Sequence, residues 1–265
     1  MYSSFSLALK YIHYFLTASN GKGHGIHSPF VFEFITKVLN DNKSYPAYER
    51  VEHLRSQLLI DHSAITIDDM GAGSSVSKSN QRKVSSIAKN AAKPKKYAQL
   101  LYRIVQYYKP GTIVELGTSL GISSSYLALA NPSAKIITLE GAASIAGLAQ
   151  KNFKALELNN IQLIKGNFDD TLSSVISKLP SVEFAFIDGN HRKDPTINYF
   201  NQLLSKSIPS AILIFDDIHW SREMEEAWEQ IKDHGSVTCT IDLFFIGLVF
   251  FRNEFMEKQH FKIRF

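Results

Sequence analysis

The sequence predicts an α/β protein built on a mostly parallel sheet. From residue 112 onward, short apolar runs rich in β-branched residues alternate with helix-forming segments. This order builds a parallel sheet with helices on both faces. The last two runs are separated by too few residues for a crossover helix, so they must be antiparallel neighbours. We therefore expect seven strands in a mostly parallel sheet, a C-terminal antiparallel hairpin and an N-terminal helical extension.

The first 60 residues show helical rather than strand periodicity. Apolar residues recur at helical spacing in residues 5–16 and again in residues 30–39, where Ser28 and Pro29 suit a helix cap and a first helical position. Residues 65–75 imitate a ligand-binding loop, with a short apolar run, acidic residues and two glycines. No second strand ending in an acid follows them, so we interpret this segment as a loop or lid over the binding site or, as the alternative, as a plain surface turn.

The seven expected strands share apolar, β-branched composition. They are Thr112–Leu116, Lys135–Glu140, Ile161–Lys165, Val182–Asp188, Ala211–Asp216, Val237–Asp242 and Phe244–Arg252. Expected helices cover about 95–108, 142–156, 172–179, 196–206 and 222–234. We divide the chain into an N-terminal helical or lid segment, residues 1–90, and a main domain, residues 91–265.

Composition places the chain among globular proteins of reducing compartments. Of its 265 residues, 45% are hydrophobic and 12% aromatic, enough for a substantial core. Cys239 is the only cysteine, which excludes an internal disulfide and a cysteine zinc cluster. The longest apolar stretch near the end, Leu243–Phe251, is too short to span a bilayer. We expect a cytoplasmic protein without a membrane span.

Charge is distributed unevenly along the chain. Residues 1–110 carry 15 Lys and Arg against 7 Asp and Glu, whereas residues 111–265 carry 14 against 18. The basic excess is densest between Lys78 and Lys96, where no acidic residue occurs. Such a stretch suits a solvated face, and it also suits an anionic substrate or a nucleic acid.

The stretch from Thr112 to Ala128 carries the main motif. A buried strand ends in Glu115, a loop with Gly117 and Gly121 follows, and a helix begins near Ser123. The glycines allow close approach of a ligand, and the helix start offers unpaired N–H groups. The spacing Glu-x-Gly-x-x-x-Gly differs from the dinucleotide-binding and P-loop patterns. It resembles the first motif of class I S-adenosylmethionine-dependent methyltransferases, a Rossmann-like family, and the resemblance covers about residues 95–265.

This resemblance implies a binding site for S-adenosylmethionine at the strand ends. Glu140 would accept hydrogen bonds from the ribose hydroxyls, and residues after the third strand would hold the adenine. An acid-lined loop also suits a sulfonium cation. As structural alternatives, Glu115 caps the loop and Glu140 is an exposed strand end. The cofactor-binding residues implied are Glu115, Gly117, Thr118, Ser119, Gly121, Ser123, Glu140, Gly141, Asn167, Phe168 and Asp188.

Acidic residues also end the fourth and fifth expected strands. Asp188, Asp216 and Asp217 would provide oxygen ligands for Mg²⁺ or a similar divalent cation. The pattern is similar to that of metal-dependent O-methyltransferases of the catechol and caffeoyl-coenzyme A type, although Asp217 stands where that group has Asn. His191 occupies the place of the lysine base of the catechol enzyme, so we expect His191 and Asp188 to be catalytic.

Several functions remain open at this stage. The first is metal-assisted O-methylation of a small hydroxylated acceptor. The alternative is a metal-independent methyltransferase that acts on a nucleic acid or another large anion through residues 78–96. A third is a binding or regulatory protein that keeps the fold without turnover, while the glycine spacing disfavours a nicotinamide-dependent enzyme. The aromatic-rich N-terminal helix would pack on its own core or on a second subunit of a homodimer.

Overall fold

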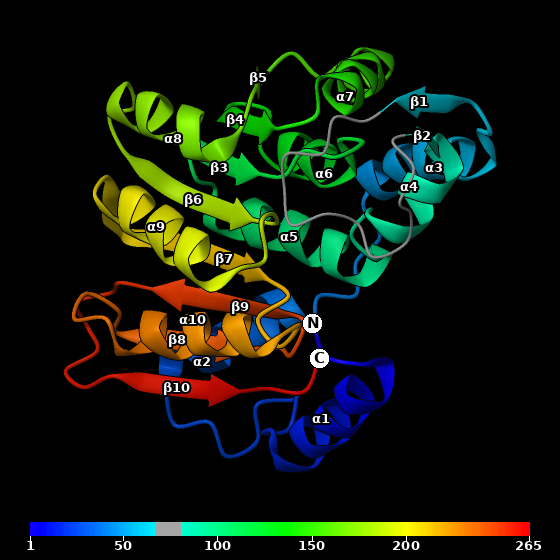
Figure 1. Ribbon diagram of the computed structural model, residues 1–265. Coiled ribbons are helices and arrows are strands. Elements are labelled where there is room, and N and C mark those ends of the chain that lie inside the picture. The colour runs from blue at the N-terminus through cyan, green and yellow to red at the C-terminus, as the bar shows by residue number, and fades with distance from the viewer. Residues whose placement is uncertain (67–80) are drawn as a thin grey trace. The chain divides into compact units, whose positions relative to one another are not determined.

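The computed structural model describes residues 1–66 and 81–265 (Figure 1). The chain forms two compact units, and we treat each separately. Unit 1 combines residues 1–41 with residues 175–265, and unit 2 consists of residues 42–174. The division expected from the sequence, at residue 90, stays a prediction. Most of the expected lid, at residues 65–75, lies outside the described residues.

Unit 2 contains the first three predicted strands. They are β3 (Thr112–Leu116), β4 (Lys135–Glu140) and β5 (Ile161–Lys165), which pair in parallel in the order β3-β4-β5. Every residue of β3 is buried, as expected of a strand covered on both faces. All three strands have the predicted bounds. Their carboxyl ends therefore lie at one edge of this part of the sheet.

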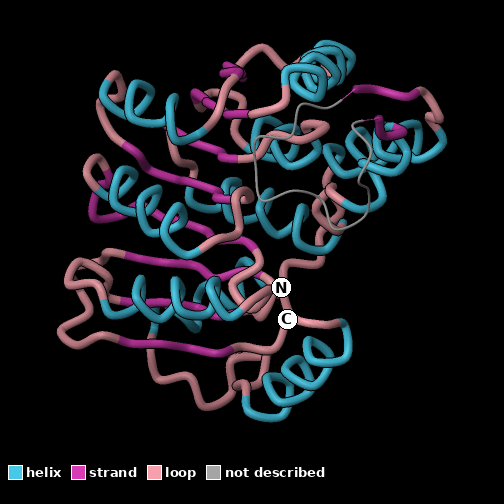
Figure 2. Tube along the Cα trace, viewed as in Figure 1, coloured by secondary structure: helices cyan, strands magenta, loops and turns pink. Residues whose placement is uncertain are grey.

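Helices connect and cover these strands (Figure 2). The helix α5 has the predicted bounds, and it packs against α6, which also contacts α3 and β4. A short antiparallel pair, β1 with β2, precedes α4. The bounds are α3 (Pro46–Ile60), β1 (Ala64–Thr66), β2 (Gln81–Lys83), α4 (Val84–Asn90), α5 (Lys95–Tyr108), α6 (Ile122–Ala130) and α7 (Ala143–Ala155), with α8 (Phe168–Ser177) crossing from unit 2 into unit 1.

Unit 1 holds five strands in the order β10-β8-β9-β7-β6. Its strands β8 and β9 are antiparallel, and β9 is also antiparallel to β7, so the predicted hairpin is confirmed. The pairs β6 with β7 and β10 with β8 are parallel. The bounds are β6 (Val182–Ile187), β7 (Ser207–Asp216), β8 (Cys239–Asp242), β9 (Ile246–Phe250) and β10 (Gln259–Lys262).

The predicted α/β class is confirmed, but the count of seven strands is wrong. Besides the seven predicted strands, the described residues contain β10 and the short β1–β2 pair. The sequence of β10, QHFK, has no apolar run, and its residues alternate between half-buried and exposed. A short polar strand that pairs with β8 on one side leaves too weak a hydrophobic signal for recognition.

The helices of unit 1 come from both ends of the chain. Ser28 caps α2 as predicted, with its hydroxyl accepting a hydrogen bond from the N–H of Val31, and a π-helical turn follows directly. The bounds are α1 (Ser4–Thr17), α2 (Pro29–Phe34), η1 (Ile35–Leu39), α9 (Lys193–Leu204) and α10 (Arg222–Asp233). Within residues 1–66 and 81–265, no helix has the combination of length and apolar character needed to cross a bilayer.

Candidate functional site

The loop between β3 and α6 has the backbone conformation that the glycine pattern predicts. Gly117, Ser119 and Gly121 all have positive φ angles, of 101°, 48° and 79°. Gly121 is also the N-cap of α6, where a Cβ atom would overlap the ring of Phe153. This position therefore needs glycine for two independent reasons, backbone conformation and lack of space.

Buried polar contacts hold the start of this loop. Glu115 is fully buried, and its carboxylate accepts hydrogen bonds from the hydroxyls of Ser124 and Thr138, the latter at 2.7 Å. The Thr138 hydroxyl also lies 2.6 Å from that of Thr118. Burial raises the pKa of Glu115, although the hydroxyls of Ser123, Ser124 and Thr138 act in the opposite direction. Glu115 thus ties β3, β4 and the loop together.

Glu140, the last residue of β4, lies beside the same loop. Its carboxylate accepts hydrogen bonds from the backbone N–H of Ser119, at 2.8 Å, and from that of Ala142, at 2.9 Å. One contact comes from the glycine loop and the other from the turn through Gly141. The carboxylate is thereby oriented by backbone on both sides. Two N–H groups do not exhaust the acceptor capacity of a carboxylate, so the side chain can also receive ligand hydroxyls.

The residues after β5 belong to the same edge. The N–H of Gly166 donates to the carbonyl of Glu140 at 2.9 Å. The side chain of Asn167 accepts a hydrogen bond from the N–H of Asp169 at 3.1 Å and so pairs one of the N–H groups at the start of α8. Phe168 is half-buried. Unit 2 thus places all predicted cofactor residues except Asp188 at the carboxyl ends of three adjacent strands.

Unit 1 contains the predicted catalytic and metal residues. Asp188 directly follows β6, and Asp216 ends β7, its side chain almost fully buried. Because Ile187 pairs with Phe215, the two aspartates follow paired positions on neighbouring strands. Asp217 has a left-handed backbone conformation, with φ of 54°, and its N–H donates to the carbonyl of Phe245 at 2.7 Å.

These acids provide the right donor chemistry for a hard cation, but their side chains do not form a recognisable metal site. In the parts of the chain that the structure describes, no group of three His, Cys, Asp or Glu side chains is arranged to hold a metal ion. His191 lies near Asp188, with 3.7 Å between Nε2 and Oδ1. The metal site at Asp188, Asp216 and Asp217 and the catalytic roles of His191 and Asp188 therefore stay predictions.

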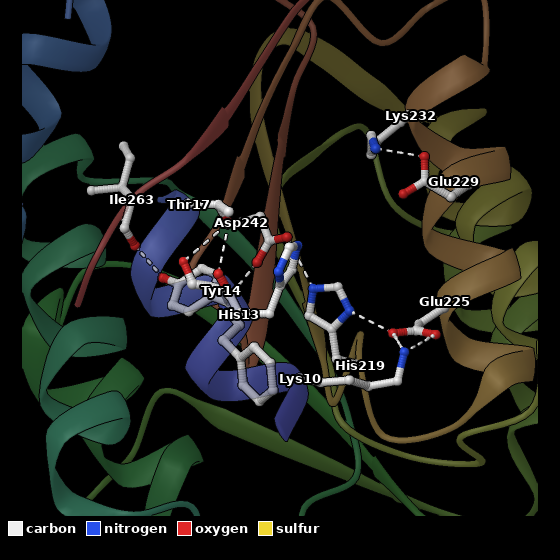
Figure 3. A network of polar contacts seen from close by, with 11 residues as sticks. Lys10, His13, Tyr14, Thr17, His219, Glu225, Glu229, Lys232, Asp242 and Ile263 are labelled. Carbon is white, nitrogen blue, oxygen red and sulfur yellow. Dashed lines mark hydrogen bonds and ion pairs between the residues drawn. The ribbon is translucent and has the colours of Figure 1, made fainter. Parts of the chain in front are cut away.

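A second polar cluster of unit 1 involves His219, just beyond β7 (Figure 3). Its Nδ1 lies 3.1 Å from a carboxylate oxygen of Glu225, and its Nε2 lies 2.9 Å from one of Asp242. Glu225 also accepts hydrogen bonds from Lys10 and from the hydroxyl of Tyr2, on and next to α1. Since both ring nitrogens face carboxylates, the arrangement fits an imidazolium that donates twice.

The pKa of His219 is raised by this cluster. Burial of the ring opposes protonation, but the hydrogen bonds and negative charges of Asp242 and Glu225 outweigh it. A raised pKa in the folded state stabilises the protein below the unfolded pKa of about 6.5, and this contribution is lost as pH rises through the folded pKa.

We therefore expect the free energy of unfolding to decline as pH rises above about 6.5. Urea titrations from pH 6 to 9 measure this free energy. The expected decline is roughly 1.5–3 kcal/mol, the cost of losing one hydrogen bond to a charged partner. The variant His219→Phe keeps an aromatic ring beside Phe244, whose ring centroid lies 5.1 Å away, but removes the titration. An equal pH dependence in this variant would contradict the assignment.

Sequence reasoning missed two supports of the loop. Thr138 links Glu115 to Thr118, and the side-chain amide of Asn152 donates to the carbonyl of Leu120 at 2.9 Å. A threonine within the apolar run of β4 was the available signal in the sequence for the first. Asn152 lies on α7, 32 residues from its partner, and no local pattern indicates that contact.

Comparisons with known proteins agree with this architecture. Residues 114–218 match the model of a family described as methyltransferase domain. The chain is 35% identical over 80 residues to a tRNA (guanine-N(7)-)-methyltransferase of Mycoplasma mobile, an alignment that covers 30% of this chain and 40% of the relative. It is 31% identical over 111 residues to the O-methyltransferase imqG of Aspergillus flavus, covering 40% of this chain and 44% of the relative. The chain thus spans less than half the length of these two relatives.

Solved structures extend the similarity over most of the chain. The O-methyltransferase from Bacillus cereus, solved in complex with SAH, superposes with a TM-score of 0.55 at 20% identity, covering 83% of this chain and 97% of that one. At this identity the likeness shows the fold. The predicted resemblance is confirmed at the level of fold: residues 114–218 match a methyltransferase domain, and the chain shares the fold of the Bacillus cereus O-methyltransferase.

Proposed function

We propose that the protein transfers a methyl group from S-adenosylmethionine to a hydroxyl oxygen of a small acceptor. The observation that carries the proposal is Glu140, whose carboxylate is fixed by the N–H groups of Ser119 and Ala142 beside the glycine loop. This arrangement lies within the segment that matches a methyltransferase domain. A pre-oriented acid at the end of the second strand suits the paired hydroxyls of a ribose.

The residues of unit 2 fit this cofactor. When bound, S-adenosylmethionine supplies an electrophilic methyl group on a positively charged sulfur. Glu140 would hold the ribose. The backbone from Gly117 to Gly121 would approach the ligand closely, because both glycines have positive φ angles and lack a Cβ atom. Asn167 and Phe168, at the start of α8, would contact the base.

In unit 1, His191 would accept the proton of the acceptor hydroxyl. An imidazole can take a proton near neutral pH, and the Asp188 carboxylate at 3.7 Å stabilises the positive charge that this step creates on the ring. Removing the proton makes the acceptor oxygen a stronger nucleophile. The names of the relatives support oxygen as the acceptor atom, since one curated relative and the Bacillus cereus structure are O-methyltransferases.

A divalent cation at Asp188, Asp216 and Asp217 is a further part of this proposal. Hard cations prefer carboxylate oxygens, and Asp188 and Asp216 follow paired positions on β6 and β7. If bound there, the cation would lower the pKa of the acceptor hydroxyl and so assist the proton transfer to His191.

The second candidate is methylation of a nucleic acid. The similarity to a tRNA methyltransferase over 80 residues favours it, as does the basic stretch from Lys78 to Lys96, of which residues 81–96 are described. Binding through such a stretch would depend steeply on salt, because each phosphate contact releases counterions.

A methyl-transfer assay separates these candidates. We expect labelled S-adenosylmethionine to methylate small phenols with adjacent hydroxyls and not bulk tRNA. A chelator should lower the rate by at least about tenfold, with recovery on adding Mg²⁺, if the cation activates the hydroxyl. Asp216→Asn should reproduce the loss, whereas Asp194→Asn, at an exposed position of α9, should not. Transfer to tRNA that is indifferent to chelator and falls steeply with salt would overturn the first candidate.

A further inference from the structure

Helix α1 is apolar on two opposite faces. Its inner face packs on unit 1, where Tyr14 forms a buried cluster with Ala18 and Phe244 and where Leu7 and Tyr11 pack against this cluster. Its outer face exposes large apolar side chains: Phe5 by 75%, Leu9 by 52%, Ile12 by 54%, Phe15 by 48% and Leu16 by 72%. A helix that is hydrophobic all round is normally covered on all sides. The outer face therefore indicates a partner surface.

The helix is fixed, so its outer face cannot turn inward. The side chain of Lys10 forms an ion pair with Glu225 at 2.9 Å, and the hydroxyl of Tyr2 donates to the same carboxylate at 2.6 Å. At the other end of the helix, the Tyr14 hydroxyl donates to the carbonyl of Ile263. Figure 3 shows Lys10 directed toward Glu225 of α10 and Tyr14 directed toward Ile263. Contacts along its whole length hold the inner face in place.

The outer face has the spacing of a helix pair. Phe5, Leu9, Ile12 and Leu16 follow one another at intervals of four, three and four residues, which is the seam of an antiparallel or parallel two-helix contact. Successive members of such a seam lie on one side of the helix. This spacing suits another helix better than a flat surface.

The charge of the outer face distinguishes between two candidate partners, an anionic membrane and a second copy of the chain. The outer face contains no Lys, Arg, Asp or Glu, and Lys10, the only residue of these types in α1, is paired with Glu225. Helices that lie on anionic membranes carry several basic residues beside the apolar face, and α1 does not. Arg264 lies over the ring of Phe15, at 4.9 Å from its centroid. An uncharged face can meet its own copy without repulsion between like charges.

The exposed area is adequate for such a contact. On the scale of about 150–250 Å² for a whole aromatic side chain, the five partly exposed side chains amount to roughly 500 Å² per copy. Two copies would bury on the order of 1,000 Å² from these side chains alone, close to the lower limit for a specific interface. Side chains at the rim would add to this value.

We propose that the outer face of α1, formed by Phe5, Leu9, Ile12, Phe15 and Leu16, pairs with the same face of a second copy across a two-fold axis. The protein is then a homodimer joined by its N-terminal helices. This inference goes beyond the proposed methyl transfer and does not rest on it.

Sedimentation equilibrium of the full chain tests the proposal. We expect the wild type to be a dimer at about 10 µM, and Leu9→Glu with Ile12→Glu to weaken dimerisation by at least about 100-fold, because the two-fold axis repeats each substitution in both copies. Leu59→Glu is the matched control: Leu59 is 41% exposed, on α3 of unit 2. Circular dichroism and the unfolding midpoint establish that the double variant is folded.

Disulfide trapping gives an independent readout. Cys239 is fully buried, so the wild type offers no exposed thiol among its described residues. Ile12→Cys should form a covalent dimer on mild oxidation, and Leu59→Cys should not. A monomeric wild type, or an undiminished dimer in the double glutamate variant, would overturn the proposal. A monomer that sediments with anionic vesicles through the same face would do so too, in favour of a lipid surface.

Discussion

Glu140→Ala is expected to weaken the binding of S-adenosylhomocysteine by at least about 100-fold, because two charge-assisted hydrogen bonds are each worth roughly 1.5–3 kcal/mol. The substitution removes the acceptor that the N–H groups of Ser119 and Ala142 orient. Glu140 is half-buried at the end of β4, so water can replace the lost contacts to the backbone. Isothermal titration calorimetry measures the affinity, and we expect the unfolding midpoint in urea to change little.

Two further variants make the Glu140 experiment specific. Glu140→Gln keeps one carbonyl acceptor and should lose less affinity than Glu140→Ala. Glu157→Ala removes an exposed acid in the loop after α7 and should leave the affinity unchanged. Wild-type affinity in Glu140→Ala would show that the ribose is held elsewhere. The proposed cofactor site would then be wrong, although the fold would stand.

Gly121→Ala is expected to destabilise the protein by about 1–3 kcal/mol and to weaken cofactor binding at the same time. The residue has φ of 79°, and an added Cβ would overlap the ring of Phe153. Either the ring or the first turn of α6 must shift, and the loop shifts with it. Urea unfolding and calorimetry report the two effects separately.

The crowding part of this effect can be isolated with a second substitution. Phe153→Ala removes the ring, so the double variant should recover the part of the loss caused by overlap and keep the part caused by the backbone conformation. Gly235→Ala is the matched control, because a Cβ there meets nothing within 4 Å. If Gly121→Ala is as stable as the wild type, the position does not need glycine.

The sequence predicted those elements whose signals are local. The bounds of β3, β4, β5 and α5 agree with prediction because each element combines a clear periodicity with flanking turn residues. The start of β7 was placed too late, at Ala211 rather than Ser207. Pro209 lies between them and argues against a continuous strand, and the pairing of β6 with β7 is irregular there.

Some parts of the candidate site could be predicted from the sequence, and others could not. Residues of the glycine loop and Glu140 follow a motif with fixed spacing, so their positions could be derived from the order of strands. The contacts of His219 could not, because they involve Glu225, Asp242 and, through Glu225, Lys10, which is more than 200 residues away. Long-range polar pairs leave no periodic pattern in a sequence. Whether three acids converge on a cation depends on side-chain directions, which strand order does not fix.

Unit 1 consists of the two ends of the chain, whereas unit 2 is a continuous segment. During translation, therefore, residues 42–174 are complete while α1 still lacks Phe244 and Ile263, the partners of Tyr14. Until the ribosome has made the last strands, the N-terminal helix exposes two apolar faces instead of one. Nascent chains that expose apolar surface are prone to aggregation, so for this protein the hazard lasts until Phe244 and Ile263 have been synthesised.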